Sequence, residues 1–293
     1  MQVTLLGTSS AEGWPGLFCR CAACYKARAL GGKNLRTRSS ALIDNTLKID
    51  FPPDTHHHIL RFGLDLRCMS ALLFTHAHDD HFSPAELQYM DPYFVPVPIS
   101  EILPVYGPPG VIERLGAALD LSRLPLSLHA LTPWKTVSIG EYRVTPVLAQ
   151  HDPSQVCFNY ILQNAEGVTL LYASDTGWYE EATWRFLETF TFDGIVAECS
   201  KGPIEGGYMA HLCIPEVIRM RQRLLAAGCF APDGRMVTTH FSHLGGLMHD
   251  ELEAALAPHG IETGYDGLSF PVERGRKRAA VPAPHTRASH QTV

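Results

Sequence analysis

The sequence predicts an α/β protein in which two mixed β-sheets pack together with helices outside them, a four-layer αββα sandwich. Short apolar or β-branched runs typical of strands come in two sets along the 293-residue chain. Stretches with helical spacing of apolar residues follow each set. No single short unit repeats itself.

The first set of strands begins near the amino terminus. Its expected members are residues 3–6, 41–43, 47–49 and 70–74. Asp44-Asn45 separates the middle two as a hairpin turn, and the last runs directly into Thr75-His76. A loop with a cluster of cysteines separates the first two strands. Helices are expected at 84–90 and 111–121, around a turn-rich stretch at 105–110.

The second set begins near Thr136. Its expected strands are residues 136–139, 143–148, 158–162, 168–173, 194–197, 236–239 and 263–270. Its expected helices are residues 180–190, 215–227 and 250–257. We therefore expect one domain over residues 1–273, followed by a tail at 274–293 that is too poor in large apolar residues to order itself.

The charge is distributed unevenly. The chain has a net charge of −6, but five basic and no acidic residues follow Glu273, so the preceding body carries 19 basic and 30 acidic side chains. An acidic body argues against broad nucleic-acid binding, which depends on Lys and Arg. The tail could contact nucleic acid or a membrane, but a solvated, mobile extension is favoured. With no apolar run long enough to span a membrane and no secretory signal, a cytoplasmic location is expected.

The stretch Thr75-His76-Ala77-His78-Asp79-Asp80-His81 is the most informative motif in the chain. In an extended segment residues two apart point the same way, so His76 and His78 can bind one ion. After the turn, Asp80 and His81 can reach a second ion nearby. Imidazole and carboxylate ligands suit zinc, iron or manganese. A histidine-rich helix start on the surface is the competing interpretation.

Two metal ions require more ligands, and suitable residues follow later strands. His151, Asp175 and His240 each end an apolar or β-branched run, where a buried strand reaches the surface. Taken singly, each is more typical of a helix cap or a satisfied polar residue. Together with the first motif they make a set of seven candidate ligands.

These residues, in this order and spacing, resemble the metallo-β-lactamase superfamily, of the dinuclear phosphodiesterase type. The resemblance covers residues 2 to about 270. It implies that one metal is bound by His76, His78 and His151, and the other by Asp80, His81 and His240. It also implies that Asp175 bridges the two ions.

The cysteine cluster Cys19-x-Cys21-x-x-Cys24 supplies three thiolates, one ligand short of a closed structural zinc site. His243 is the candidate for the fourth ligand, because it lies three residues beyond His240. The alternative is three reduced cysteines without a metal. We thus expect two divalent ions, zinc or manganese, in the active site and one structural zinc in the loop 19–24.

The cysteine cluster is similar to that of one branch, the phosphoribosyl cyclic phosphate phosphodiesterases of the carbon–phosphorus lyase pathway and their relatives. In that branch a histidine matched here by His211 is implicated in catalysis. The sequence departs from the branch at Ser9 and Ser10, where two glycines are common, and at Lys201, where histidine is common. These departures affect the expected substrate more than the expected reaction.

The resemblance implies a phosphodiesterase that hydrolyses a small cyclic phosphate through a metal-bridged hydroxide. His211 is the candidate for stabilising charge or protonating the leaving oxygen, and Asp80 is a second candidate for proton transfer. Two alternatives stay open. One is a transfer-RNA 3′-end-processing endonuclease, and the other a non-hydrolytic zinc-binding accessory protein of pyrroloquinoline quinone biosynthesis. A small phosphodiester is the expected partner, and a homodimer is a common state for such enzymes.

Overall fold

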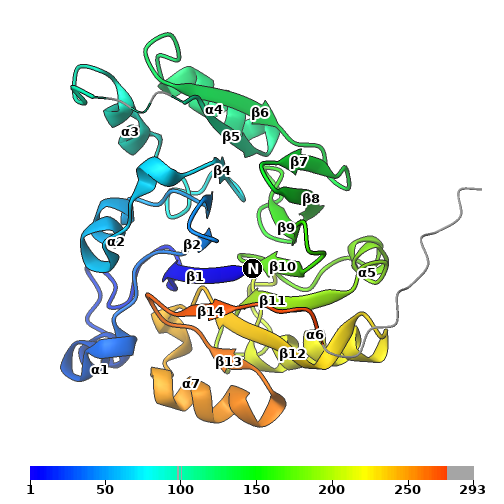
Figure 1. Ribbon diagram of the computed structural model, residues 1–293. Coiled ribbons are helices and arrows are strands. Elements are labelled where there is room, and N and C mark those ends of the chain that lie inside the picture. Colours follow the sequence, from blue (N-terminus) through cyan, green and yellow to red (C-terminus); the bar gives the residue numbers. More distant parts are fainter. Residues whose placement is uncertain (98, 100, 276–293) are drawn as a thin grey trace, which may run out of the picture.

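The computed structural model describes residues 1–97, 99 and 101–275. The predicted basic tail therefore lies outside the described residues, apart from Arg274 and Gly275. Within the described chain, strands form two seven-stranded sheets (Figure 1). The first has the order β14-β1-β2-β3-β4-β5-β6, and the second has the order β13-β12-β11-β10-β9-β8-β7.

Strands of the first sheet come from the first half of the chain, except for the last one. They are β1 (Gln2–Gly7), β2 (Ser40–Ile43), β3 (Leu47–Ile49), β4 (Ala71–Leu73), β5 (Leu103–Gly107), β6 (Leu126–Ala130) and β14 (Ser269–Pro271). The second sheet contains β7 (Val137–Ile139), β8 (Tyr142–Leu148), β9 (Phe158–Gln163), β10 (Thr169–Ala173), β11 (Phe192–Glu198), β12 (Phe230–Thr239) and β13 (Glu262–Thr263).

Helices lie between the strands in sequence. They are α1 (Ala22–Leu30), α2 (Thr55–Phe62), α3 (Pro84–Leu87), α4 (Pro109–Ala118), α5 (Glu181–Leu187), α6 (Ile214–Ala226) and α7 (His249–Leu256). No helix in the part of the chain that the structure describes is both long and apolar enough to cross a membrane.

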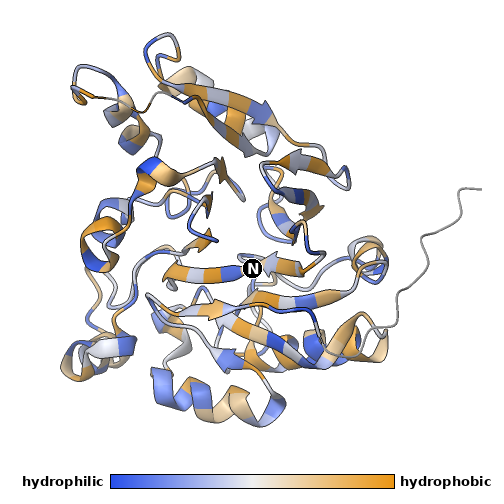
Figure 2. Cartoon of the chain, in the orientation of Figure 1, coloured by the Kyte–Doolittle hydropathy of each residue, from blue (hydrophilic) through white to orange (hydrophobic). Residues whose placement is uncertain are grey.

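Three apolar clusters define the layers. The central cluster joins side chains of both sheets, such as Val3 and Ile43 with Tyr160 and Val196. A second cluster packs α5, α6 and α7 against the other face of the second sheet. A third packs α3 and α4 against the first sheet. Figure 2 shows apolar residues along the strands, and both apolar and polar residues along the helices. The predicted αββα sandwich is confirmed.

Parallel pairing brings several strand ends to one edge. In the second sheet β10 pairs parallel with β11, and β11 with β12. In the first sheet β3 pairs parallel with β4. The carboxyl ends of parallel neighbours meet at the same sheet edge. The residues that directly follow β3, β4, β10, β11 and β12 can therefore come close together across the two sheets.

Some expected elements were wrong. The single strand expected at 263–270 is two short strands, β13 and β14, which belong to different sheets. The expected helix at 84–90 is α3 followed by a 3₁₀ turn, Gln88–Met90. The expected loop that carries the cysteine cluster contains α1, and β5 and β6 were not predicted. β6 is an edge strand with a single buried residue and so carries little periodic signal. β5 contains Pro104 and ends at Gly107, and both residue types are depleted in strands.

Candidate metal centre

The first part of the site is the end of β4. Thr75 and His76 follow this strand, and three imidazole nitrogens converge beyond it. Nε2 of His76 lies 2.9 Å from Nδ1 of His78, and Nδ1 of His78 lies 2.9 Å from Nε2 of His151. His151 follows β8, so segments more than 70 residues apart in sequence meet here. Three ring nitrogens at one point are typical of a metal-binding site.

Asp175 links this group to a second one. Its Oδ2 lies 3.2 Å from Nε2 of both His76 and His151 and 3.3 Å from Nε2 of His81. His240 Nε2 lies 3.6 Å from the same oxygen. Asp175 belongs to three groups of candidate ligands, one of which also contains Glu198, His211 and His240. The other two groups meet at its Oδ2 and are His76, His78, His151 and Asp175, and Asp80, His81, Asp175 and His240. These are the seven residues that the sequence predicted as ligands.

Both late segments of the site adopt an uncommon backbone conformation. Asp175 has a φ of 59° and His240 a φ of 56°, in the left-handed region that residues other than glycine rarely adopt. Each follows the end of a buried strand, β10 or β12. Such strain persists only where the surroundings fix it, and it clusters at functional sites.

Each histidine of the two groups also has a partner for its other ring nitrogen. Asp50 lies 2.7 Å from Nδ1 of His81, and Asp152 lies 3.0 Å from Nε2 of His78. The remaining three contacts are Thr75 Oγ1 with His76 Nδ1, Ala210 O with His151 Nδ1, and Ser200 Oγ with His240 Nδ1. Metal-binding histidines almost always have such a partner, which fixes the tautomer and the ring orientation.

The electrostatics of the site favour bound cations. Burial lowers the pKa of His76 to about 4, so its ring is neutral and can be a ligand. Burial alone would raise the pKa of Asp175, but the histidines around it, His240 first, hold it well below the usual range. Burial likewise opposes protonation of His81, yet Asp80 and Asp50 raise its pKa well above normal. A cation can replace that proton as the counter-charge for the carboxylates.

The donor set also fits metal ions. Each of the two groups combines imidazoles with at least one carboxylate, and Oδ2 of Asp175 faces imidazole nitrogens of both. Oδ1 of Asp175 faces His211 instead, which leaves Oδ2 for the two groups. Imidazole and carboxylate are ligands that zinc and manganese take in proteins, so the residues present fit the dinuclear centre that the resemblance implies.

His211 lies beside the two groups. Its Nδ1 is 2.7 Å from Oε1 of Glu198 and 3.1 Å from Oδ1 of Asp175. Burial alone would lower the pKa of His211, but these two carboxylates, Glu198 first, raise it above the usual value. Glu198 ends β11, is fully buried, and accepts further hydrogen bonds from the backbone amides of Thr176 and Ser200. It therefore ties His211 to the strand end.

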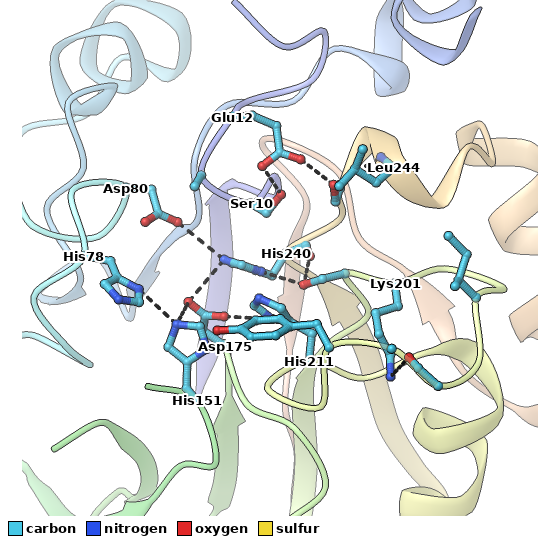
Figure 3. A pocket seen from close by; sticks show the side chains of 17 residues that line it. Ser10, Glu12, His78, Asp80, His151, Asp175, Lys201, His211, His240 and Leu244 are labelled. Carbon is cyan, nitrogen blue, oxygen red and sulfur yellow. Dashed lines mark hydrogen bonds and ion pairs between the residues drawn. The ribbon is translucent and has the colours of Figure 1, made fainter. Parts of the chain in front are cut away.

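The two groups form the floor of a pocket. Figure 3 shows His78, His151, Asp175, His211 and His240 gathered at this pocket. The cavity has a volume of about 440 Å³. Residues from three other segments complete its wall, namely Ser10, Ala11, Glu12, Lys201, Tyr208 and Leu244. The pocket thus gives a small molecule access to the candidate metal ligands.

The cysteine cluster forms a separate group with His243. The candidate ligand atoms of Cys19, Cys21, Cys24 and His243 all lie within 4.8 Å of one another. Nδ1 of His243 is 3.4 Å from Sγ of Cys21. The amide of Cys24, at the start of α1, donates to the same sulfur and is the main reason that its pKa falls to about 6. A thiolate at this position is the form that binds zinc.

Sequence reasoning missed several residues around the site. Asp152, Glu198 and Glu12 received no role, although each contacts or borders the histidine groups. Asp152 directly follows His151, and this was the one signal available for it. Glu198 ends a predicted strand, which was a weaker signal. Of the histidines at 56–58, His58 is buried, and its Nε2 lies 2.8 Å from Thr37 Oγ1. Among the described residues, His58 belongs to none of the groups that could hold a metal ion.

Gly177 fixes the position of the loop that carries His211. A Cβ atom added at Gly177 would lie 1.9 Å from the carbonyl oxygen of Met209, two residues before His211. We expect Gly177→Ala to displace this loop and to lower turnover by roughly 10²-fold, since misplacement by about 1 Å has such effects. Steady-state kinetics on the phosphodiester that the sequence leads us to expect as substrate measure this loss. Gly110→Ala is the control, because a Cβ there meets open space, and an equal loss in both variants would contradict the prediction.

Comparisons with known proteins agree with this geometry. The family model described as the beta-lactamase superfamily domain matches residues 49–241, a range that includes all seven candidate ligands of the histidine groups. No curated protein matched the chain.

Three solved structures are similar to the chain. A diphosphatase of the PhnP family is 20% identical over 93% of this chain and 98% of that one, with a TM-score of 0.72. Zn²⁺-bound PqqB from Methylobacterium extorquens is 17% identical over 92% of this chain and 100% of its own, with a TM-score of 0.73. The short form of human tRNase Z is 16% identical over 94% and 100%, with a TM-score of 0.64. At these identities the likeness concerns the fold.

Proposed function

The chain belongs to the beta-lactamase superfamily, and from this premise we propose that it is a metal-dependent phosphodiesterase acting on a small cyclic phosphate. We propose that His76, His78 and His151 bind one divalent ion, that Asp80, His81 and His240 bind a second, and that Asp175 is shared. Zinc and manganese both suit these ligands. Cys19, Cys21, Cys24 and His243 would bind a structural zinc.

The observation that carries this proposal is the position of Asp175. One oxygen of this buried side chain lies within 3.2–3.6 Å of four imidazole nitrogens that belong to two groups. Such a shared carboxylate is typical of two metal ions held a few ångströms apart. Bound at this place, two divalent ions lower the pKa of a water and neutralise the charge of a phosphate ester.

The protein's own residues would complete the reaction. Glu198 holds Nδ1 of His211, so Nε2 is the nitrogen that remains for the substrate. We propose that Nε2 of His211 donates a hydrogen bond or a proton to the leaving oxygen, an alkoxide that is a strong base when it departs. Opening of a cyclic diester then leaves a phosphomonoester. Asp80 stays a second candidate for proton transfer, although ligation already accounts for its position.

The volume of the pocket and the net charge of the protein favour a small substrate over RNA. A cavity of about 440 Å³ accommodates a nucleotide-sized compound. The body of the chain is strongly acidic, whereas proteins that bind RNA depend on Lys and Arg for contact with phosphates. The human tRNase Z fold neighbour nevertheless makes precursor transfer RNA the natural competing substrate to test.

Metal analysis combined with a substrate screen tests the proposal. We expect purified protein to hold three metal ions, and to hydrolyse cyclic and linear phosphodiesters faster than precursor transfer RNA or phosphomonoesters. Chelation should abolish turnover, and zinc or manganese should restore it. Mass spectrometry of the metals and a phosphate-release assay measure both. One ion per chain without any turnover would instead support a non-hydrolytic zinc protein.

A further inference from the structure

The wall of the pocket formed by Ser10, Glu12 and Ser242 has no part in the proposed reaction. Ser10 and Glu12 follow β1, whereas Ser242 follows β12 and His240. Ser9 and Phe241 form a parallel β-bridge between these two segments. Figure 3 shows Glu12 and Ser10 together on the side of the pocket opposite His151. We call these three residues the acceptor wall.

Glu12 is fixed at the centre of the acceptor wall. Ser10 Oγ donates to its Oε2 at 2.9 Å, and Ser242 Oγ donates a short hydrogen bond to its Oε1. Nε2 of His243, in the cysteine–histidine cluster, lies 3.5 Å from the same Oε1. The side chain of Glu12 is 31% exposed. Contacts on three sides keep its carboxylate at the pocket instead of in bulk solvent.

The two serines present oxygen lone pairs, not protons, to the pocket. A hydroxyl has one proton and two acceptor sites. The proton of Ser10 and that of Ser242 both point at Glu12. The amide of Leu244 donates to Ser242 Oγ and fills one of its acceptor sites. The Glu12 carboxylate, the lone pairs of Ser10 and one lone pair of Ser242 remain on this wall, so the wall accepts hydrogen bonds and repels anions. A zinc ion held by three thiolates leaves the neighbouring cluster anionic as well.

Among the described residues that line the pocket, no Lys or Arg without a carboxylate partner offsets the acceptor wall. Apart from the histidines, Lys201 is the one basic side chain among them. Its Nζ lies 3.1 Å from Glu216 Oε2 and donates to the carbonyl oxygen of Gly206. The charge of Lys201 is therefore already paired with a carboxylate.

The outer rim of the pocket is apolar. Ile204, Tyr208 and Leu244 line it, and their side chains are largely exposed. The ring of Tyr208 lies beside that of His211, with centroids 5.5 Å apart. Exposed apolar side chains around a polar floor suit an uncharged organic group.

We propose that Glu12 determines specificity and selects a phosphodiester whose organic part is uncharged and presents hydroxyl donors to the acceptor wall. This inference rests on the proposed function and narrows its substrate class. A second phosphate on the substrate would bring an additional charge of nearly −2 toward the carboxylate. The site therefore disfavours phosphoribosyl cyclic phosphates. Ser9 and Ser10, which stand where two glycines are common in the branch that acts on those compounds, belong to the same loop as Glu12.

Two substrates that differ by one phosphate test the proposal. We expect the wild type to have a higher kcat/KM for adenosine 2′,3′-cyclic phosphate than for its 5′-phosphorylated form. Glu12→Gln should reduce this preference by roughly tenfold, the effect of one unit charge at several ångströms in a partly screened site. The ratio within one variant cancels any general loss from altered folding or metal content.

Glu205→Gln is the matched control. It removes the same charge from the exposed segment between Ile204 and Gly206, but Glu205 does not line the pocket. The preference should stay unchanged in this variant. Equal ratios in wild type and Glu12→Gln would overturn the inference, and so would an equal shift in Glu205→Gln, which would indicate a long-range charge effect.

A binding measurement separates this inference from the proposed reaction. Calorimetric titration with adenosine 2′-phosphate and adenosine 2′,5′-bisphosphate needs no turnover. The bisphosphate should bind more weakly to the wild type, and Glu12→Gln should narrow the difference in Kd. If no diester is hydrolysed but this difference appears, the proposed reaction fails and the acceptor wall stands. If diesters are hydrolysed and the two ligands bind equally, the acceptor wall fails alone.

Discussion

Replacing Asp175 with Asn is expected to empty the candidate metal centre and to lower turnover by roughly 10³-fold or more. The Asn side chain has the same shape as the Asp side chain but no negative charge, so it cannot act as a shared ligand of two cations. Stabilisation by metal ions is worth several kcal/mol in the transition state, and each 1.36 kcal/mol changes the rate tenfold. Metal content by mass spectrometry and kcat on a phosphodiester measure the two effects.

Asp79→Asn is the matched control for this experiment. Asp79 belongs to the same histidine-rich motif, but its side chain is 99% exposed and lies 4.0 Å from Arg114 on the surface. The Asp79→Asn protein should retain its metal content and its turnover. An Asp175→Asn protein with full metal content and normal kcat would refute the dinuclear centre.

Replacing His211 with Ala is expected to cut turnover by roughly 10²-fold or more, while leaving the bound metals in place. The reason is that His211 lies beside the two groups and is held by Glu198, yet belongs to neither of the two groups joined by Asp175 Oδ2. Steady-state kinetics combined with metal analysis of the same sample measure both properties. Unaltered turnover would remove His211 from the mechanism.

The leaving group separates proton donation by His211 from a structural role. An alkoxide needs a proton when it departs, whereas p-nitrophenolate is a weak base and does not. The loss in His211→Ala should therefore be much smaller with bis(p-nitrophenyl) phosphate than with an alkyl diester. An equal loss with both substrates would contradict proton donation. His259→Ala, at an exposed histidine, controls for removal of an imidazole.

Local sequence predicted much of the fold and most of the candidate centre. Strand β4 is an apolar run that ends three residues before His76, and His76 and His78 both lie in the irregular segment that follows it. β8 and β10 are likewise largely buried runs, which end three residues before His151 and two residues before Asp175, and β12 ends directly before His240. These strands could be predicted locally, because a buried strand requires a run of consecutive apolar or β-branched residues. The roles of these residues as ligands, and of residues 1–273 as one domain, stay predictions.

Other elements of the fold could not be predicted from the local sequence. The short edge strands β13 and β14 looked like one strand, because nothing local says that the chain changes sheets between Thr263 and Ser269. Helix α1 was read as a loop, because cysteine and basic residues obscure its apolar face. Each of these elements is stabilised by packing against distant segments, which outweighs local propensity.

The residue types of the candidate centre, and their places at strand ends, were set by the sequence alone. Their partners depend on how the strands pair and how the two sheets pack. Parallel pairing of β10, β11 and β12 carries Glu198 beside Asp175, and the bridge between Ser9 and Phe241 carries Glu12 to the pocket. These contacts join residues 22 to 230 positions apart in the chain. Glu198 and Glu12 have no characteristic sequence spacing from the candidate ligands. They can therefore be identified as residues of the site only when the folded chain shows which side chains they contact.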